Sequence, residues 1–395
     1  MRLGYGALLA VAATAAFFSN VSLYLFESKL TEVPPLWWMG AVAALALPLA
    51  VPYGHSLLVP TAGIIWWALG YLVVSLCWFA FFPTTADGVQ EMRNRLLSVG
   101  LIALMWLIVQ QRGALAAARW TILGGTLFAA GMNLFEFVFP GTYSTTIGRA
   151  AGLYMNPNVS GAALVLGMLV SADLLRPWWR IVLVAIVGLA VTATFSRAAI
   201  AAWLLVSLTL MAAPLRAMGA IRALATVAAA VAATGVALGY VLEKEEAART
   251  ALRAQVLVDR LGVVSGGEKA DLSANERRDL VEAALESVAA HPWAGSGLGA
   301  NKFSSRESGS HNVYLDHAAQ HGIAGVLLLP ALALALVAGT RGSARANAMR
   351  VAFFLLLWAL FSHNVLEEFY LLTALVIQAA VFRESAVRRP PEVRP

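Results

Sequence analysis

The residues best suited to chemistry are histidines and arginines that stand at the ends of apolar stretches. His311, His317 and His321 lie close together at the start of a long apolar run. A neutral imidazole can take a proton from a hydroxyl group at neutral pH. A histidine beside several guanidinium groups therefore predicts a general base next to an anion-binding site. That pairing suits transfer of a group from a phosphorylated carrier to an alcohol.

Several arginines are candidates for binding the phosphates of such a carrier. Arg197 is nearly alone in a turn between two apolar stretches, and Arg149 lies in the short segment 141–158. Arg93 and Arg95 stand at the start of another apolar stretch. Cations that lie near one another form a site for a polyanion such as pyrophosphate. For Arg95 we favour the alternative that its side chain reaches toward lipid phosphate.

The adjacent arginines Arg277 and Arg278 are predicted to have different roles. A capping-box sequence, SANE at 273–276, predicts that a helix begins there. At about 100° per residue, Arg277 falls on the apolar stripe of that helix and Arg278 on its charged side. We therefore expect Arg278 to be exposed to solvent. Arg277 is expected to face inward and to need an anionic partner, either an internal acid or a ligand.

Other polar residues near these stretches carry weaker signals. Asn156 and Asn158 flank a proline, and we expect Asn158 to cap the next helix. Sugar or phosphate binding is the alternative for both.

His317 and His321 share a helix face, but two ligands make half a zinc site. No third ligand has suitable spacing, so we predict no metal. His363 is expected at the same membrane face as the other histidines, either near the entrance of the site or as a helix-end residue hydrogen-bonded to Glu367.

The composition indicates that these residues are held in place by helices that span a membrane. Hydrophobic residues make up 60% of the 395 and charged residues 13%, against about 25% charged in soluble domains. Apolar runs near 20 residues recur along the chain. The sequence predicts an all-α polytopic membrane protein with about twelve transmembrane helices, eleven being the next most favoured count. The predicted spans are 5–26, 36–51, 57–81, 94–110, 120–139, 158–174, 178–194, 196–213, 222–242, 312–338, 350–362 and 366–382.

The distribution of arginine predicts the orientation of these spans. If the N-terminus lies in the cytoplasm, most short loops that carry arginine face the cytoplasm. The net charge of +6 therefore reflects membrane topology and does not indicate nucleic-acid binding. Residues 1–242 then form spans 1–9, and 243–311 form one helical periplasmic segment. Residues 312–382 form spans 10–12, and 383–395 a cytoplasmic tail. His311 and the candidate arginines fall on the periplasmic side.

Several motifs in order resemble the O-antigen ligase and O-antigen polymerase superfamily of inner-membrane proteins. The motifs lie between about residues 150 and 330. They are GLYMNPN at 152–158, TFSRA at 194–198, Arg277 with AAL at 283–285, HPWAGSGLG at 291–299, HNVYL at 311–315 and GIAG at 322–325.

The resemblance implies a GT-C-type glycosyltransferase that uses an undecaprenyl-pyrophosphate-linked glycan. A ligase of this kind moves the glycan onto a sugar hydroxyl of lipid A–core. The essential histidine of the family maps onto His311, and its outer arginines map onto Arg197 and Arg277. We expect Arg149, Arg93, Asn156 and Asn158 to assist donor binding without a cofactor. The residues expected at the rim of the site are Tyr314, His317, His363 and Arg278.

Two other functions remain open from the sequence. An O-antigen polymerase shares the architecture, and we favour the ligase because of the compact layout with one long loop between spans 9 and 10. An anion transporter predicts charges near mid-membrane and repeated halves with broken helices. The acids within the predicted spans lie near span ends, and the halves do not match, so transport is less favoured.

Overall fold

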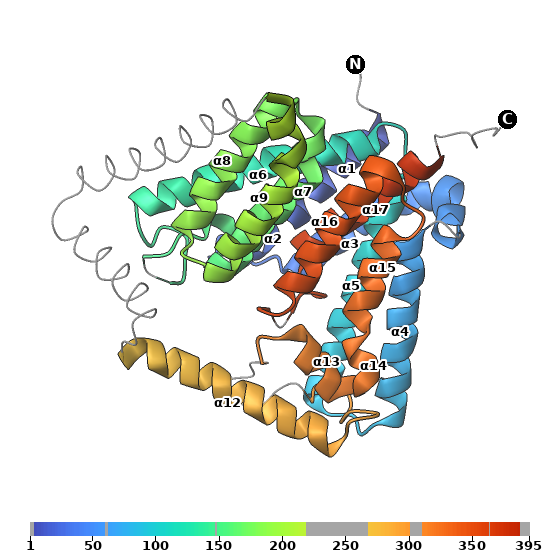
Figure 1. The fold of residues 1–395 in the computed structure, drawn as a ribbon. Coiled ribbons are helices and arrows are strands. Elements are labelled where there is room, and N and C mark those ends of the chain that lie inside the picture. Colours follow the sequence, from blue (N-terminus) through green and yellow to red (C-terminus); the bar gives the residue numbers. More distant parts are fainter. Residues whose placement is uncertain are drawn as a thin grey trace. The chain divides into compact units, whose positions relative to one another are not determined.

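The computed structural model describes residues 4–59, 62–146, 148–218, 268–300, 310–362 and 364–387. The chain forms two compact units, Met1–Ile122 with Arg277–Pro395, and Leu123–Glu276. The described residues form α-helices, short 3-10 helices and connecting turns, with no strand among them (Figure 1). The prediction of an all-helical protein is confirmed for these residues.

The first unit is organised around α5, which packs against α1, α3, α4 and α17. α5 begins at Ala86 because the Thr85 side chain accepts a hydrogen bond from Gly88 N at 3.0 Å and caps the helix. In the same unit α15 packs against α4 and α16 (Figure 1). Its N-terminal elements are α1 (Tyr5–Phe18), α2 (Val21–Glu27), α3 (Pro35–Tyr53), η1 (Gly54–Leu58), α4 (Gly63–Phe81), α5 (Ala86–Val109) and the start of α6 (Ala114–Val138). Its C-terminal elements are the end of α12 (Glu268–Ala290), α13 (Val313–His321), α14 (Ile323–Val326), α15 (Leu328–Val337), α16 (Gly342–Trp358) and α17 (Phe369–Val387).

In the second unit α7, α8 and α9 pack against one another. These helices are apolar on most sides, which is typical of helices buried among others or in lipid. The unit also holds the rest of α6 and the start of α12. Its other elements are η2 (Gly152–Tyr154), α7 (Pro157–Ser171), η3 (Ala172–Leu174), α8 (Pro177–Ala193) and α9 (Arg197–Met218).

Five described helical segments are long and apolar enough to cross a membrane. The bent pair α1 and α2 would make a sixth, and three shorter apolar helices lie at 177–193, 197–211 and 323–337. The five are Pro35–Leu58, Gly63–Phe81, Ala86–Val109, Ala114–Val138 and Pro157–Leu174. The number twelve stays a prediction, and the predicted span 222–242 lies outside the described residues.

Two predicted spans are interrupted in the structure, and one predicted helix start is wrong. The span 5–26 is bent by 50° where Asn20 adopts a left-handed backbone (φ 60°). The helix expected to begin at 273 already begins at Glu268, so the SANE sequence is interior to α12. Local capping chemistry only permits a helix to start, and here the helix continues past that signal. The predicted end at His291 and Pro292 is confirmed, because α12 ends at Ala290.

The predicted span 312–338 is broken at Gly322 into α13 and the helices that follow. Gly322 has φ 64° and ψ −150°, a conformation almost confined to glycine. It also packs directly on a neighbouring segment, because a Cβ built on Gly322 would lie 2.4 Å from the carbonyl carbon of Trp293. α13 is therefore a separate nine-residue helix that carries the polar residues of the motif, and α15 carries the apolar ones.

We expect Gly322→Ala to lower the free energy of unfolding by more than about 2 kcal/mol, because it adds backbone strain to a clash with a main-chain atom. Thermal unfolding in detergent measures the effect. Gly100→Ala is the matched control. Gly100 lies inside α5 with nothing within 4 Å of the added methyl group, so this variant should be as stable as the wild type or more so. Equal stability of the two variants would contradict the packing described for Gly322.

Candidate functional site

His311 lies on a tight turn directly before α13. Its backbone is left-handed (φ 56°), and its side chain is half-buried. The turn is held on both sides of the histidine. The N–H and Oγ of Ser310 donate to Asp316 Oδ1 at 2.9 and 2.7 Å. Asn312 is the N-cap of α13 and accepts from Tyr314 N at 3.0 Å. The backbone that presents the imidazole is therefore fixed by local hydrogen bonds.

Further contacts join the start of α13 to the end of α16. Val313 N donates to Ala359 O at 3.0 Å, and the Tyr314 hydroxyl donates to Leu356 O at 3.0 Å. Tyr314, expected at the rim, thus anchors α13 through its hydroxyl group. His363 lies outside the described residues.

The turn that carries Arg197 lies in the second unit, between α8 and α9. Phe195 has a left-handed backbone (φ 50°). The Thr194 hydroxyl donates to Val191 O at 2.7 Å and accepts from Ser196 N at 3.2 Å. Arg197 is the first residue of α9, and its side chain is exposed. The N-terminus of a helix carries partial positive charge, so the dipole of α9 adds to the guanidinium charge there.

Arg149 is tied to this turn. Its Nε donates to Thr194 O at 2.9 Å, and its Nη2 donates to Asn158 Oδ1 at 2.9 Å. The neighbouring Ala150 N donates to Ala193 O at 3.1 Å. The structure therefore brings Arg149 and Asn158 together with the turn before Arg197. In this arrangement both side chains support the turn.

The N-cap of α7 is Asn156, so the expectation that Asn158 caps the helix is wrong. Asn156 Oδ1 accepts from Asn158 N at 2.9 Å, and Pro157 occupies the first helical position. Proline suits that position because its backbone has no N–H to be left without a partner. Asn158 is consequently free of the capping role and accepts from Arg149 instead.

Glu136, one of the acids near the span ends, holds the loop that carries Arg149. Its carboxylate is 2% exposed and accepts from backbone N–H groups on two stretches of the loop. Oε1 accepts from Tyr143 N at 2.8 Å and from Ser144 N. Oε2 accepts from Ala151 N at 2.7 Å and from Gly152 N at 2.9 Å. One buried carboxylate therefore pins both ends of the loop. An acid at the end of an apolar helix was the only signal in the sequence.

We expect Glu136→Gln to destabilise the protein by about 2–5 kcal/mol, because its NH₂ group cannot accept the N–H bonds of one loop stretch. The midpoint of thermal unfolding and the susceptibility of residues 139–156 to protease measure the effect. Glu286→Gln, at an exposed carboxylate on α12, is the matched control and should leave both unchanged. Equal behaviour of the two variants would show that the loop does not depend on the carboxylate.

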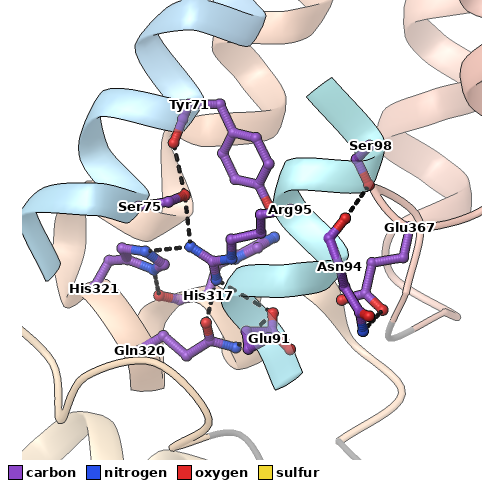
Figure 2. A network of polar contacts seen from close by, with 10 residues as sticks. All are labelled: Tyr71, Ser75, Glu91, Asn94, Arg95, Ser98, His317, Gln320, His321 and Glu367. Carbon is purple, nitrogen blue, oxygen red and sulfur yellow. Dashed lines mark hydrogen bonds and ion pairs between the residues drawn. The ribbon is translucent and has the colours of Figure 1, made fainter. Parts of the chain in front are cut away.

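Arg95 is fully buried, so the interpretation that it reaches lipid phosphate is wrong. Its Nη1 donates to Ser75 Oγ at 3.0 Å and to His321 Nε2 at 2.8 Å (Figure 2). Its Nη2 donates to Glu91 Oε1 at 3.3 Å and to Gln320 Oε1. The guanidinium carbon lies 5.3 Å from the centre of the Tyr71 ring. The ion pair with Glu91 balances the buried charge.

One contact of the buried cluster around Arg95 could be predicted from the sequence, and the others arise only from tertiary structure. Glu91 and Arg95 are four residues apart on α5, a spacing that places opposite charges on one helix face. The acceptors on α13 lie more than 220 residues away in sequence, at Gln320 and His321. Arg93, the other arginine of this stretch, is exposed.

The pair His317 and His321 is not arranged as two free ligands. Their ring centres are 5.8 Å apart. Because the guanidinium only donates, His321 Nε2 must be the acceptor, and the Nδ1 proton then points to His317 O at 3.3 Å. Both nitrogens of His321 are therefore engaged in the hydrogen-bond network around Arg95.

α12 presents Arg278 to solvent, as predicted. Ala284 on the predicted apolar stripe is fully buried, and Val281 and Val288 are half-buried, whereas Leu285 is 51% exposed. The side chain of Arg277 lies outside the described part of the chain, so its inward orientation stays a prediction.

One family model matches part of the chain. Residues 181–330 match the family model described as O-Antigen ligase. The resemblance inferred from the motifs is therefore confirmed over this segment, which contains Arg197, Arg277 and His311. No curated protein matches the chain significantly.

Proposed function

Because residues 181–330 match the O-antigen ligase family, we propose that the chain is a glycosyltransferase of lipopolysaccharide biosynthesis in the bacterial inner membrane. The donor is an O-antigen glycan linked to undecaprenyl pyrophosphate. The acceptor is a sugar hydroxyl of lipid A–core on the periplasmic side. The family match carries this proposal, because it includes Arg197, Arg277 and His311 in one segment.

His311 is the general base of the proposed reaction. Its imidazole takes the proton of the acceptor hydroxyl while the hydroxyl oxygen attacks the anomeric carbon of the donor. The bond from that carbon to the phosphate oxygen breaks, and undecaprenyl pyrophosphate leaves with the electron pair. Attack from the face opposite the leaving group inverts the anomeric configuration. The fixed turn between Ser310 and Asn312 supports this role, because it holds the histidine backbone in place.

Arg197 and Arg277 bind the pyrophosphate and stabilise the charge that develops as it leaves. Exposure of Arg197 at the first turn of α9 supports its role, since the helix dipole also favours an anion there. Guanidinium groups supply this stabilisation without a metal, so the proposed reaction is metal-independent. Arg93, Arg149, Asn156 and Asn158 assist donor binding. Arg149 and Asn158 also support the turn before Arg197, and Asn156 caps α7. Tyr314, His317, His363 and Arg278 stay proposed rim residues.

A reconstituted transfer assay tests the proposal. Purified protein in liposomes is supplied with synthetic lipid-linked glycan and with lipopolysaccharide that lacks O-antigen. We expect a ladder of glycan on the lipopolysaccharide, equally strong in the presence of EDTA. Growth of the lipid-linked chain without lipopolysaccharide would identify a polymerase instead. Transfer that requires added divalent metal would contradict the metal-independent mechanism.

A further inference from the structure

The Arg95 cluster is a buried polar network that the proposed chemistry does not use. It joins α4 and α5 to α13 through side chains of Ser75, Glu91, Gln320 and His321 (Figure 2). Gln320 Nε2 also reaches Glu91 Oε1 at 3.5 Å. A charged group buried in a membrane protein is costly unless it is paired, so its presence calls for a functional explanation.

The geometry of the cluster requires an arginine. Two nitrogens of one planar group each serve two acceptors, while the guanidinium carbon lies over the Tyr71 ring. A lysine ammonium group carries the same charge, but its three donors are on one nitrogen and cannot reproduce the planar arrangement of two donor nitrogens. Arg95 therefore fixes both the position of α13 and the tautomer of His321.

The same end of α13 is joined to the segment that follows α12. Ser296 N donates to Ala319 O at 2.8 Å, and Gly297 N donates to Gln320 O at 3.1 Å. Trp78 Nε1 donates to Ala294 O at 2.7 Å, so α4 holds this segment as well. Arg95 thus secures the junction between the helix that carries Arg277 and the helix that begins beside His311.

We propose that Arg95 is a positioning residue for His311, an inference that rests on the proposed function. α13 has nine residues, so at about 1.5 Å per residue its two ends lie roughly 13 Å apart. Arg95 holds one end, and His311 precedes the other. Because Val313 and Tyr314 hold the start of α13 against α16, a tilt at the Arg95 end pivots this short helix about those contacts and turns the imidazole away from the acceptor hydroxyl. A displacement of about 1 Å is enough to slow a reaction by up to about 10²-fold.

The test compares Arg95→Lys with Arg112→Lys in the transfer assay. Arg112 is an exposed residue just beyond the opposite end of α5 and has no part in the proposed site. We expect Arg95→Lys to lower kcat per folded molecule at least tenfold and to leave the KM for the donor within about twofold. Arg112→Lys should change neither. A purely structural role would lower the folded fraction and leave kcat per folded molecule unchanged.

A second pair of variants tests the contact itself. His321→Gln keeps an acceptor for the guanidinium and should retain kcat within about twofold, whereas His321→Leu should lower it about tenfold. If the two residues act through one contact, the double variant of Arg95→Lys and His321→Leu should lose little more than the worse single variant. Should Arg95→Lys not fold, His321→Leu carries the test, because it leaves the Arg95–Glu91 ion pair in place.

Three outcomes overturn the inference. If the wild type is active and Arg95→Lys has an unchanged kcat, Arg95 has no positioning role, and the proposed function still stands. The same conclusion follows from an unchanged kcat in His321→Leu if only that variant folds. A loss confined to the donor KM would place Arg95 in binding. Wild-type protein that transfers no glycan would overturn the proposed function, and this inference with it.

Discussion

His311→Asn is expected to lower the kcat of glycan transfer by about 10²- to 10⁴-fold, the contribution that a positioned general base makes. Asparagine is the chosen replacement because it tolerates the left-handed backbone at position 311 (φ 56°). Its amide cannot act as a base at neutral pH. Folding should therefore survive while proton transfer is lost.

The comparison with His311→Ala separates chemistry from strain. Alanine adds a left-handed penalty of about 1–2 kcal/mol in stability, whereas asparagine adds little. Both variants should lose transfer equally once rates are normalised to folded protein, and only the alanine variant should unfold at a lower temperature. The assay measures initial rates at saturating donor, with thermal unfolding recorded alongside. Transfer by His311→Asn at the wild-type rate would remove the histidine from the mechanism.

Removal of either pyrophosphate-binding arginine is expected to have the second largest effect. Arg197→Gln and Arg277→Gln should each lower kcat/KM for the donor by about 10²-fold, since a hydrogen bond to a charged group contributes about 1.5–3 kcal/mol. Lysine at either position should restore part of the rate, because it keeps the charge and loses the paired geometry. Initial rates over a range of donor concentrations give the value.

The neighbouring arginine provides the matched comparison for this prediction. Arg278 is exposed on α12, and Arg278→Gln should lower kcat/KM by less than about threefold, as weakly coupled surface charges do. Competition by free undecaprenyl pyrophosphate should weaken in Arg197→Gln and Arg277→Gln and stay unchanged in Arg278→Gln. A larger loss in Arg278→Gln than in Arg277→Gln would show that the helical register inferred from the apolar stripe is wrong.

Hydrophobic content predicted most of the described helices. The spans expected at 120–139 and 178–194 correspond to α6 (Ala114–Val138) and α8 (Pro177–Ala193). Such predictions succeed because a long apolar segment in lipid must satisfy its own backbone hydrogen bonds, and a helix does so within the segment. The break at Gly322 could not be predicted in this way. Glycine is tolerated in apolar helices, and only the approach of Trp293 requires the chain to turn there.

For the candidate site as well, some features could be predicted from the sequence and others depended on tertiary structure. Residue types and the resemblance to the ligase and polymerase superfamily selected His311, Arg197 and Arg277 as candidates, and their roles stay predictions. Tertiary structure alone decided what supports them. Arg95 was expected to face lipid, yet it is buried against acceptors on α13. Asn158 was expected to cap a helix, yet it accepts from Arg149. A single side chain offers the same hydrogen bonds in many settings, so its partner depends on which distant segment packs beside it.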